Sequence, residues 1–187
     1  MPHILVGTRT SKDMDKKYAL ALLISGGQTG VDRAALDFAM QNGIAHAGWC
    51  PLGRRAEDGV IPERYLLKEA STKLYQQRTQ LNVRDSQATL IIRDEARRSR
   101  GTALTIKCAE KLNKPVLVID IGDYDYKKVI KWLNTVRPQV LNVAGPRLSE
   151  SPDAAAAASA ILAAAICRDQ QTVVKWPPTR PFTPDLF

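Results

Sequence analysis

The residues best suited to chemistry in this chain lie in a glycine-rich turn, Ser25 to Gly30, and in the Asp32-Arg33 pair that follows it. Apolar residues precede the turn and helix-forming residues follow it, which predicts a strand, a tight loop and a helix. Glycines let the backbone approach a ligand closely, and the first N–H groups of a helix have no internal partner. The turn is therefore suited to hold an anion such as phosphate. In the alternative interpretation the turn only packs helix on strand, Asp32 only caps the helix and Arg33 only faces solvent.

A second polar loop, residues 51–64, carries four charged side chains of interest, Arg54, Arg55, Glu57 and Asp58. These residues could form a surface ion-pair cluster. However, the prolines and glycines of the loop fix its shape, which a merely solvated loop does not need. We therefore expect the arginines to neutralise a bound anion and the carboxylates to face the rest of the ligand. If the protein is a catalyst, Glu57 and Asp58 are the candidate acid–base residues.

Two further segments place polar residues beside predicted strands. Asn82 and Asp85 are three residues apart, with Arg84 between them, and share one face of a predicted helix. They either bind a base or ribose or only end the helix. Gly101 and Thr102 begin another predicted helix, and Thr102 is expected to be its N-cap. Two glycine–threonine helix starts at one sheet edge would make a two-part anion site.

The order of the predicted elements indicates an α/β fold. We expect strands at 18–24, 44–50, 88–92, 116–121 and 140–143, and helices at 31–41, 78–86, 102–112, 125–136 and 152–167. This alternation predicts βαβ units and a mostly parallel sheet, which binds ligands beyond the carboxyl ends of its strands. The loops at 26–30, 51–64, 93–102 and 145–149 should then leave one edge, where Arg147 would add another cation.

The length of 187 residues fits a single domain with two flanking segments. We predict an N-terminal extension over 1–17, one Rossmann-like ligand-binding domain over 18–168, and a proline- and aromatic-rich tail over 169–187. The tail is expected to pack on the body or on a neighbouring subunit, to be disordered, or to bind a partner.

The net charge, the cysteine count and the missing motifs exclude some classes of protein but do not identify the function. The net charge of +8 suits a polyanion but equally suits a small phosphorylated ligand. The three cysteines are widely spaced, so we expect neither a disulfide framework nor a structural metal. The sequence lacks a secretory signal and an apolar run long enough for a bilayer, so we expect a cytoplasmic protein without a membrane partner. Serine-hydrolase, zinc-protease and Walker motifs are missing as well.

Several motifs in this order resemble the family of proteins named as molybdenum carriers. The resemblance rests on residues 25–37, on Gly48-Trp49-Cys50-Pro51 with residues 53–59, on residues 82–86 and 101–105, and on residues 141–147. It covers about residues 20–167. That family is similar to lysine-decarboxylase-like (LOG) proteins and belongs with circularly permuted Rossmann-like domains of the YpsA-type SLOG superfamily. The resemblance implies a three-layer α/β/α sandwich, often dimeric.

The resemblance also implies a function, which is to bind and carry a phosphorylated pterin or nucleotide-like ligand. Molybdenum cofactor (molybdopterin) is the first choice, with a molybdoenzyme as acceptor. The alternative is a nucleotide sensor or a LOG-like enzyme that releases the base from nucleoside monophosphates. Against the enzyme, residues 103–106 lack the acid that follows the corresponding loop in LOG enzymes. A single-stranded nucleic-acid binder is not favoured, because the loops hold few stacking aromatics.

The candidate ligand-binding residues are Gly26, Gly27, Gln28, Thr29, Gly30, Asp32, Arg33, Arg54, Arg55, Glu57, Asp58, Asn82, Arg84, Asp85, Gly101, Thr102 and Arg147.

Overall fold

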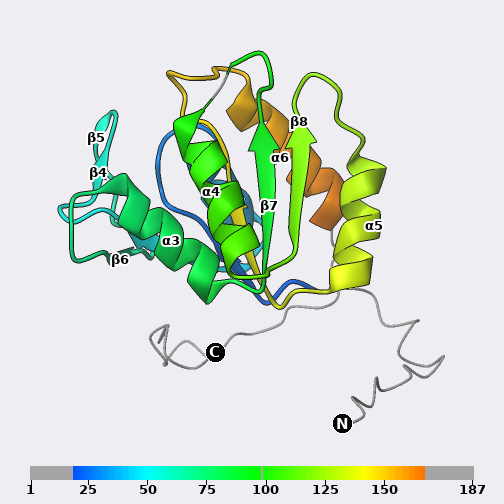
Figure 1. Ribbon diagram of the computed structural model, residues 1–187, viewed down its shortest axis with the longest axis horizontal. Coiled ribbons are helices and arrows are strands. Elements are labelled where there is room, and N and C mark those ends of the chain that lie inside the picture. The colour runs from blue at the N-terminus through cyan, green and yellow to red at the C-terminus, as the bar shows by residue number, and fades with distance from the viewer. Residues whose placement is uncertain (1–18, 98, 167–187) are drawn as a thin grey trace, which may run out of the picture.

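The computed structural model describes residues 19–97 and 99–166 (Figure 1). In this part of the chain, five parallel strands form a central sheet in the order β2-β1-β9-β7-β8. They are β1 (Leu22–Ile24), β2 (Ala45–Ala47), β7 (Ala88–Arg93), β8 (Val116–Asp120) and β9 (Val140–Ala144). The predicted extension over 1–17 and the predicted tail over 169–187 lie outside the described residues.

Helices cover both faces of this sheet. Helices α3 (Tyr75–Asp85) and α4 (Arg100–Lys111) lie on the face turned to the viewer in Figure 1, while α2 (Val31–Gln41), α5 (Tyr126–Val136) and α6 (Ala154–Ile166) lie on the other. The predicted three-layer α/β/α Rossmann-like sandwich is confirmed. None of the described helices is long and apolar enough to cross a membrane.

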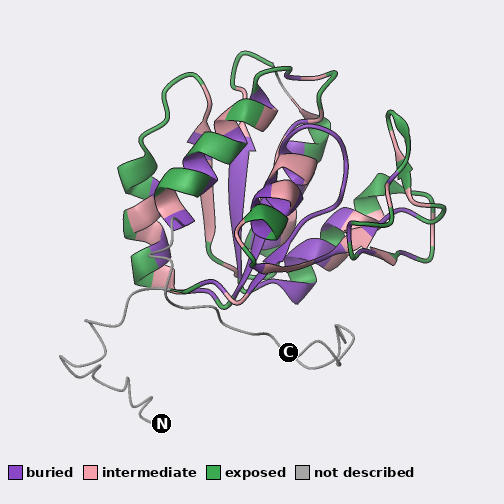
Figure 2. Cartoon of the chain, turned by 180° about the vertical axis from the view of Figure 1, so that it is seen from behind, coloured by how far each residue is buried: buried purple, intermediate pink, exposed green. Residues whose placement is uncertain are grey.

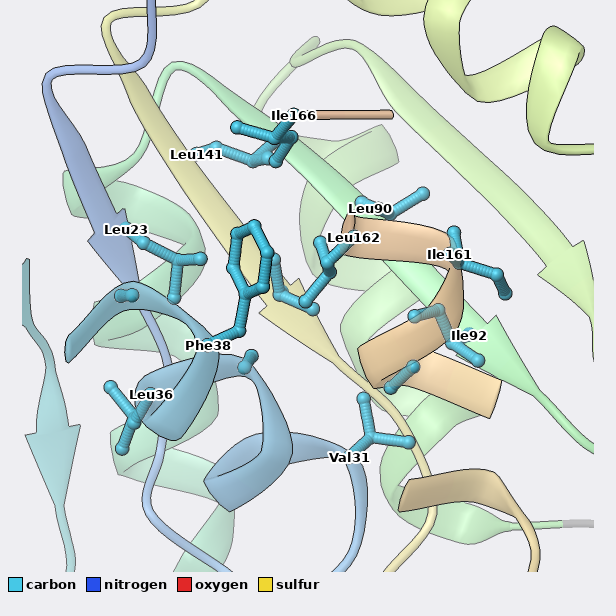
Figure 3. Packing of buried hydrophobic residues seen from close by; sticks show 14 of the residues in the cluster. Leu23, Val31, Leu36, Phe38, Leu90, Ile92, Leu141, Ile161, Leu162 and Ile166 are labelled. Atoms are coloured by element: carbon cyan, nitrogen blue, oxygen red, sulfur yellow. The ribbon is translucent and has the colours of Figure 1, made fainter. Parts of the chain in front are cut away.

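The core lies between the central strands and the α2–α6 layer. Strands β7 and β9 are mostly apolar and almost entirely buried, as expected for parallel strands covered on both faces. Phe38 of α2 and Leu162 of α6 pack toward Leu23 and Leu141 of the sheet (Figure 3). Burying each of these side chains contributes about 1.5–3 kcal/mol, so this layer fixes where the loops above it begin.

The connections create a topological switch point at the carboxyl edge of the sheet. From β1 the chain passes through α2 to β2 on one side, and from β7 it passes through α4 to β8 on the other. Because these crossovers run in opposite directions, α2 and α4 lie on opposite faces of the sheet. Strand β9 lies between β1 and β7, and Gly145 follows it directly. This divergence is the topological switch point at which open α/β sheets bind ligands.

One predicted strand is two strands in the structure. The segment expected as one strand over 44–50 divides at Gly48 into β2 and β3 (Trp49–Cys50). Gly48 has φ +148°, and a Cβ atom there would overlap the carbonyl oxygen of Ser25. Strand β3 leaves the main sheet and pairs with β6 (Lys68–Glu69).

The predicted polar loop over 51–64 contains a small hairpin, β4 (Arg55–Ala56) with β5 (Gly59–Val60). It projects from the body and is mostly exposed (Figure 2). We call residues 55–60 the acidic hairpin, because its turn is Glu57-Asp58. The helix predicted over 78–86 begins earlier, at Tyr75, and the predicted Tyr18–Ile24 strand is regular only from Leu22.

Candidate ligand-binding site

The glycine-rich turn between β1 and α2 is closed over by the rest of the protein. A Cβ atom at Gly26 would overlap the Arg78 guanidinium, and one at Gly27 would overlap Leu67. Gly30 has φ +75° and lies against the carbonyl oxygen of Pro146, which would be 2.5 Å from a Cβ atom. These glycines are therefore needed for close approach of protein groups, whatever ligand the site accepts.

The N–H groups of the turn also face protein acceptors. Thr29 N donates to Gln28 Oε1 at 3.0 Å, and Val31 N donates to the Pro146 carbonyl oxygen at 3.2 Å. Arg33 N donates to the Gln28 carbonyl oxygen at 3.1 Å. Protein acceptors thus occupy the N–H groups of Gln28 and Thr29 within the predicted anion cradle.

Asp32 is the most buried acid of the site. It is not the N-cap of α2, a position held by Gly30. Its carboxylate lies 2.9 Å from Arg78 Nη1 of α3 and accepts a long bond from Gln28 N at 3.4 Å. Burial raises the pKa of Asp32 above its ordinary value, and the Arg78 charge offsets part of that rise. Asp32 is thereby held as a structural partner of Arg78.

Arg78 is a site residue that the sequence analysis missed. It lies 46 residues from Asp32, its side chain is 15% exposed, and its Nε is buried without a hydrogen bond. Its ion pair with Asp32 connects α3 to the N-terminal end of α2. Nothing in the sequence around Arg78 distinguishes it among 27 lysines and arginines, so only the fold could identify it.

The acidic hairpin meets the glycine-rich turn through Glu57 and Asp58. Asp58 pairs with both terminal nitrogens of Arg33, at 2.5 and 2.7 Å, and Arg33 Nε donates to the Gly27 carbonyl oxygen. Glu57 accepts hydrogen bonds from the hydroxyls of Thr29 and Ser149. The structure thus brings the predicted residues of two loops together.

Arg147 joins the same group from the loop after β9. Its Nε lies 3.5 Å from Glu57 Oε2 and 3.3 Å from Glu150 Oε1. Burial alone would raise the pKa of Glu57, but the bonds from Ser149 and Thr29, together with the Arg147 charge, hold it below its ordinary value. A bond from Arg33 likewise lowers the pKa of Asp58. Both carboxyl groups are therefore ionised at neutral pH.

Arg54 and Arg55 behave differently from each other. The Arg54 guanidinium donates to four carbonyl oxygens of its own loop, those of Ile61, Pro62, Tyr65 and Leu67, at 3.0–3.1 Å. It therefore organises the base of the hairpin. Arg55 is exposed on β4.

Asn82 and Asp85 are occupied by Trp49. The Asn82 amide accepts from Trp49 N at 2.7 Å and donates to its carbonyl oxygen at 3.0 Å. Asp85 Oδ2 accepts from the Trp49 indole nitrogen at 2.7 Å, and Arg84 pairs with Asp85 at 2.6 Å. These side chains position β3 beneath α3, away from the groups around Glu57.

Helix α4 starts two residues before the predicted position. The helix begins at Arg100, and Ser99 is its N-cap, accepting from Thr102 N at 3.4 Å. The expectation that Thr102 caps the helix is therefore wrong, because Thr102 already lies inside the first turn. The Thr102 side chain therefore has no capping role. Thr102 is 6% exposed, and its hydroxyl has no hydrogen-bond partner among the described residues. Gly101 precedes it, exposed and without strain.

Thr102 lines a cavity of about 340 Å³ above the α4 start. The other polar walls come from the β7–α4 loop: Arg93, Asp94, Glu95, Arg97 and Ser99. Its acids are already paired, because Glu95 lies 3.0 Å from Arg93 and Asp94 accepts from the Ser151 hydroxyl. A wider groove of about 660 Å³ follows α2 and α6 on the other face.

In residues 19–97 and 99–166, no group of three or more His, Cys, Asp or Glu side chains is arranged to hold a metal ion. Cys50 is buried and Cys108 partly buried, and burial raises the pKa of each thiol. Neither residue lines either cavity. Cys167 lies outside the described residues.

Together, the parallel five-stranded sheet and the helices on both of its faces define a Rossmann-like domain. The circularly permuted YpsA SLOG family matches residues 23–166, and the chain belongs to this family. A crystal structure of a "Putative molybdenum carrier protein" from Syntrophus aciditrophicus SB is 43% identical. That alignment covers 83% of this chain and 99% of the other, with a TM-score of 0.77. The comparison with curated proteins gives no match.

Proposed function

We propose that this protein binds and carries a small phosphorylated ligand, with the phosphate held in the cavity at the start of α4. Molybdenum cofactor, a pterin with a terminal phosphate, is the first candidate, and a nucleotide is the second. The name of the Syntrophus protein supports the first choice, and family membership supports a ligand-binding role. The observation that carries the proposal is the buried hydroxyl of Thr102, which has no hydrogen-bond partner in residues 19–97 and 99–166.

The chemistry of this cavity fits a phosphate group. A buried hydroxyl without a partner is costly, so a site that keeps one is suited to a ligand that accepts its bond. The N-terminus of α4 adds N–H donors and the positive end of the helix dipole. Arg93 and Arg97 line the same space, where Arg93 is paired with Glu95 and Asp120 and Arg97 with Asp94, so a phosphate would have to share these arginines with the acids.

Native mass spectrometry of gently purified protein is the first test, with molybdenum cofactor or AMP added in parallel. A retained pterin-sized mass would support the carrier, whereas uptake of AMP alone would favour a nucleotide sensor. The same spectra give the oligomeric state, for which we expect a dimer. Free adenine in the AMP sample would indicate a hydrolase instead. Protein that takes up neither ligand would contradict the proposal.

Thr102→Val tests the site directly, because valine keeps the shape and removes only the hydroxyl. We expect about 10-fold weaker binding of AMP or cofactor, the usual effect of losing one hydrogen bond to a charged group. The matched control is Thr79→Val, since the Thr79 hydroxyl bonds the Tyr75 carbonyl oxygen within α3. Unchanged affinity in Thr102→Val, measured by titration calorimetry, would remove the phosphate from this position.

A further inference from the structure

The Glu57 carboxylate lies where an oxyanion would be expected. It accepts hydrogen bonds from the hydroxyls of Thr29 and Ser149 and from the Ser149 backbone N–H. Arg147 stands beside it, 3.5 Å away. Two hydroxyls, a backbone amide and an arginine around one anion form the donor set with which proteins bind phosphate or sulfate.

The carboxylate does not use this donor set completely. Arg147 Nε is buried and makes no hydrogen bond within the described part of the chain, although two carboxylates lie within 3.5 Å of it. Thr29 Oγ1 also accepts from Leu148 N, which fixes the hydroxyl toward Glu57. A tetrahedral oxyanion has more acceptor oxygens and more charge than a carboxylate, so it can engage Arg147 as well.

The hairpin that carries Glu57 is weakly attached. Its residues are mostly exposed, including Val60 at 72% (Figure 2). Its turn touches the body through polar contacts: those of Glu57, the Asp58–Arg33 pair, and Glu57 N donating to Gln28 Oε1. Segments with few buried apolar contacts open at low free-energy cost. Beneath it, the four carbonyl bonds of Arg54 keep the base in place.

We propose that Thr29, Arg147 and Ser149 form a second oxyanion subsite, separate from the cavity at the start of α4, that Glu57 occupies it as an internal stand-in, and that an incoming oxyanion displaces the acidic hairpin. The inference rests on the proposed function only in that the natural ligand is taken to be anionic. Asp58 acts in the same way on Arg33, which becomes available when the hairpin leaves. The hairpin is thus a lid that competes with the ligand.

Binding of inorganic phosphate to Glu57→Gln tests this lid. The variant has the same shape and lacks the charge, so we expect it to bind phosphate about 10-fold more tightly than the wild type. Glu57→Ala should bind at least as tightly. Glu63→Gln is the control, because it removes a carboxylate from an exposed position of the same segment. Equal or weaker binding by both Glu57 variants, or binding by neither, would overturn the proposal.

Hydrogen exchange distinguishes a displaced lid from a ligand contact. In the wild type, saturating phosphate should slow amide exchange at residues 147–150 and speed it at residues 55–60. Slower exchange in both segments would mean that Glu57 stays in place and contacts the ion, contrary to the proposal. Thr102→Val is independent of these readouts. If it weakens AMP binding while Glu57→Gln changes nothing, the lid is refuted and the proposed function stands.

Discussion

The two glycine–threonine helix starts of this protein look alike in sequence and differ in structure. Before α2, the turn is buried, its glycines lie against Arg78, Leu67 and Pro146, and the N–H groups of Gln28, Thr29 and Val31 donate to protein acceptors. Before α4, Gly101 is exposed, and Thr102, whose buried hydroxyl has no hydrogen-bond partner among the described residues, lines a cavity. Protein groups therefore occupy the helix start before α2, whereas a cavity lies at the helix start before α4.

This difference shows that a glycine-rich helix start supplies donors but does not decide what binds them. At α2 three carboxylates form ion pairs with arginines: Asp32 with Arg78, Glu57 with Arg147 and Asp58 with Arg33. At α4 the nearby acids are engaged with Arg93 and Ser151. An unpartnered buried donor is therefore a better guide to a ligand than the glycine pattern itself.

The largest expected effect is a difference in unfolding free energy between alanine substitutions at Gly30 and at Gly101. Gly30→Ala places a Cβ atom at φ +75° and 2.5 Å from a backbone oxygen, so we expect a loss of about 3–4 kcal/mol in unfolding free energy. Gly101→Ala has no close neighbour and should change stability by less than about 1 kcal/mol, in the stabilising direction. Urea denaturation of both variants checks this contrast. Similar losses at the two positions would mean that both turns are closed.

The next effect concerns the ion pair that closes the first turn. Arg78→Met leaves the Asp32 carboxylate buried without its partner, which should cost about 3 kcal/mol. Adding Asp32→Asn should restore part of that stability, because the uncompensated charge is then gone. Thermal unfolding at neutral pH measures both. A double variant that is less stable than Arg78→Met would show that Asp32 has another essential partner.

The smallest effect is the dependence of hairpin attachment on pH. The pKa values of Glu57 and Asp58 are lowered in the folded protein, so the unfolded chain takes up protons first as pH falls. The stability that they contribute is present above their ordinary values, 4.5 and 3.8, and is lost below them. The wild type should therefore exceed Glu57→Gln by about 2–4 °C in Tm at pH 7 and by less at pH 3.5. A gap that widens in acid would contradict this sign.

Much of the fold could be predicted because the strands and helices carry clear periodicity. The continuous apolar run of β7 and the small-residue pattern of α2 each identify an element within a residue or two. The division of the 44–50 strand could not be predicted, because it depends on Gly48 meeting Ser25, a contact made only in the folded chain. The hairpin could not be predicted either, because its two-residue strands are too short to show an alternation of apolar and polar residues.

The candidate site was predictable in its location and only partly in its roles. Thr29, Glu57 and Arg147 meet as their loops suggested, because parallel strands bring those loops to one edge. The choice of partners could not be read from the sequence. Asn82 and Asp85 were grouped with the ligand, yet their polar atoms hold Trp49. Arg78 gave no signal at all, since its role depends on the packing of α3 beside α2.

The position of β9 has a consequence for how the protein is made. The last strand in the chain lies in the middle of the sheet, where it pairs with β1 and β7, and Ser25 bonds Val143 across 118 positions. Until β9 is synthesised, the β1–β2 and β7–β8 pairs have no strand to join them. Apolar strand edges then stay unpaired on the ribosome, so the nascent chain depends on protection from aggregation until its final third emerges.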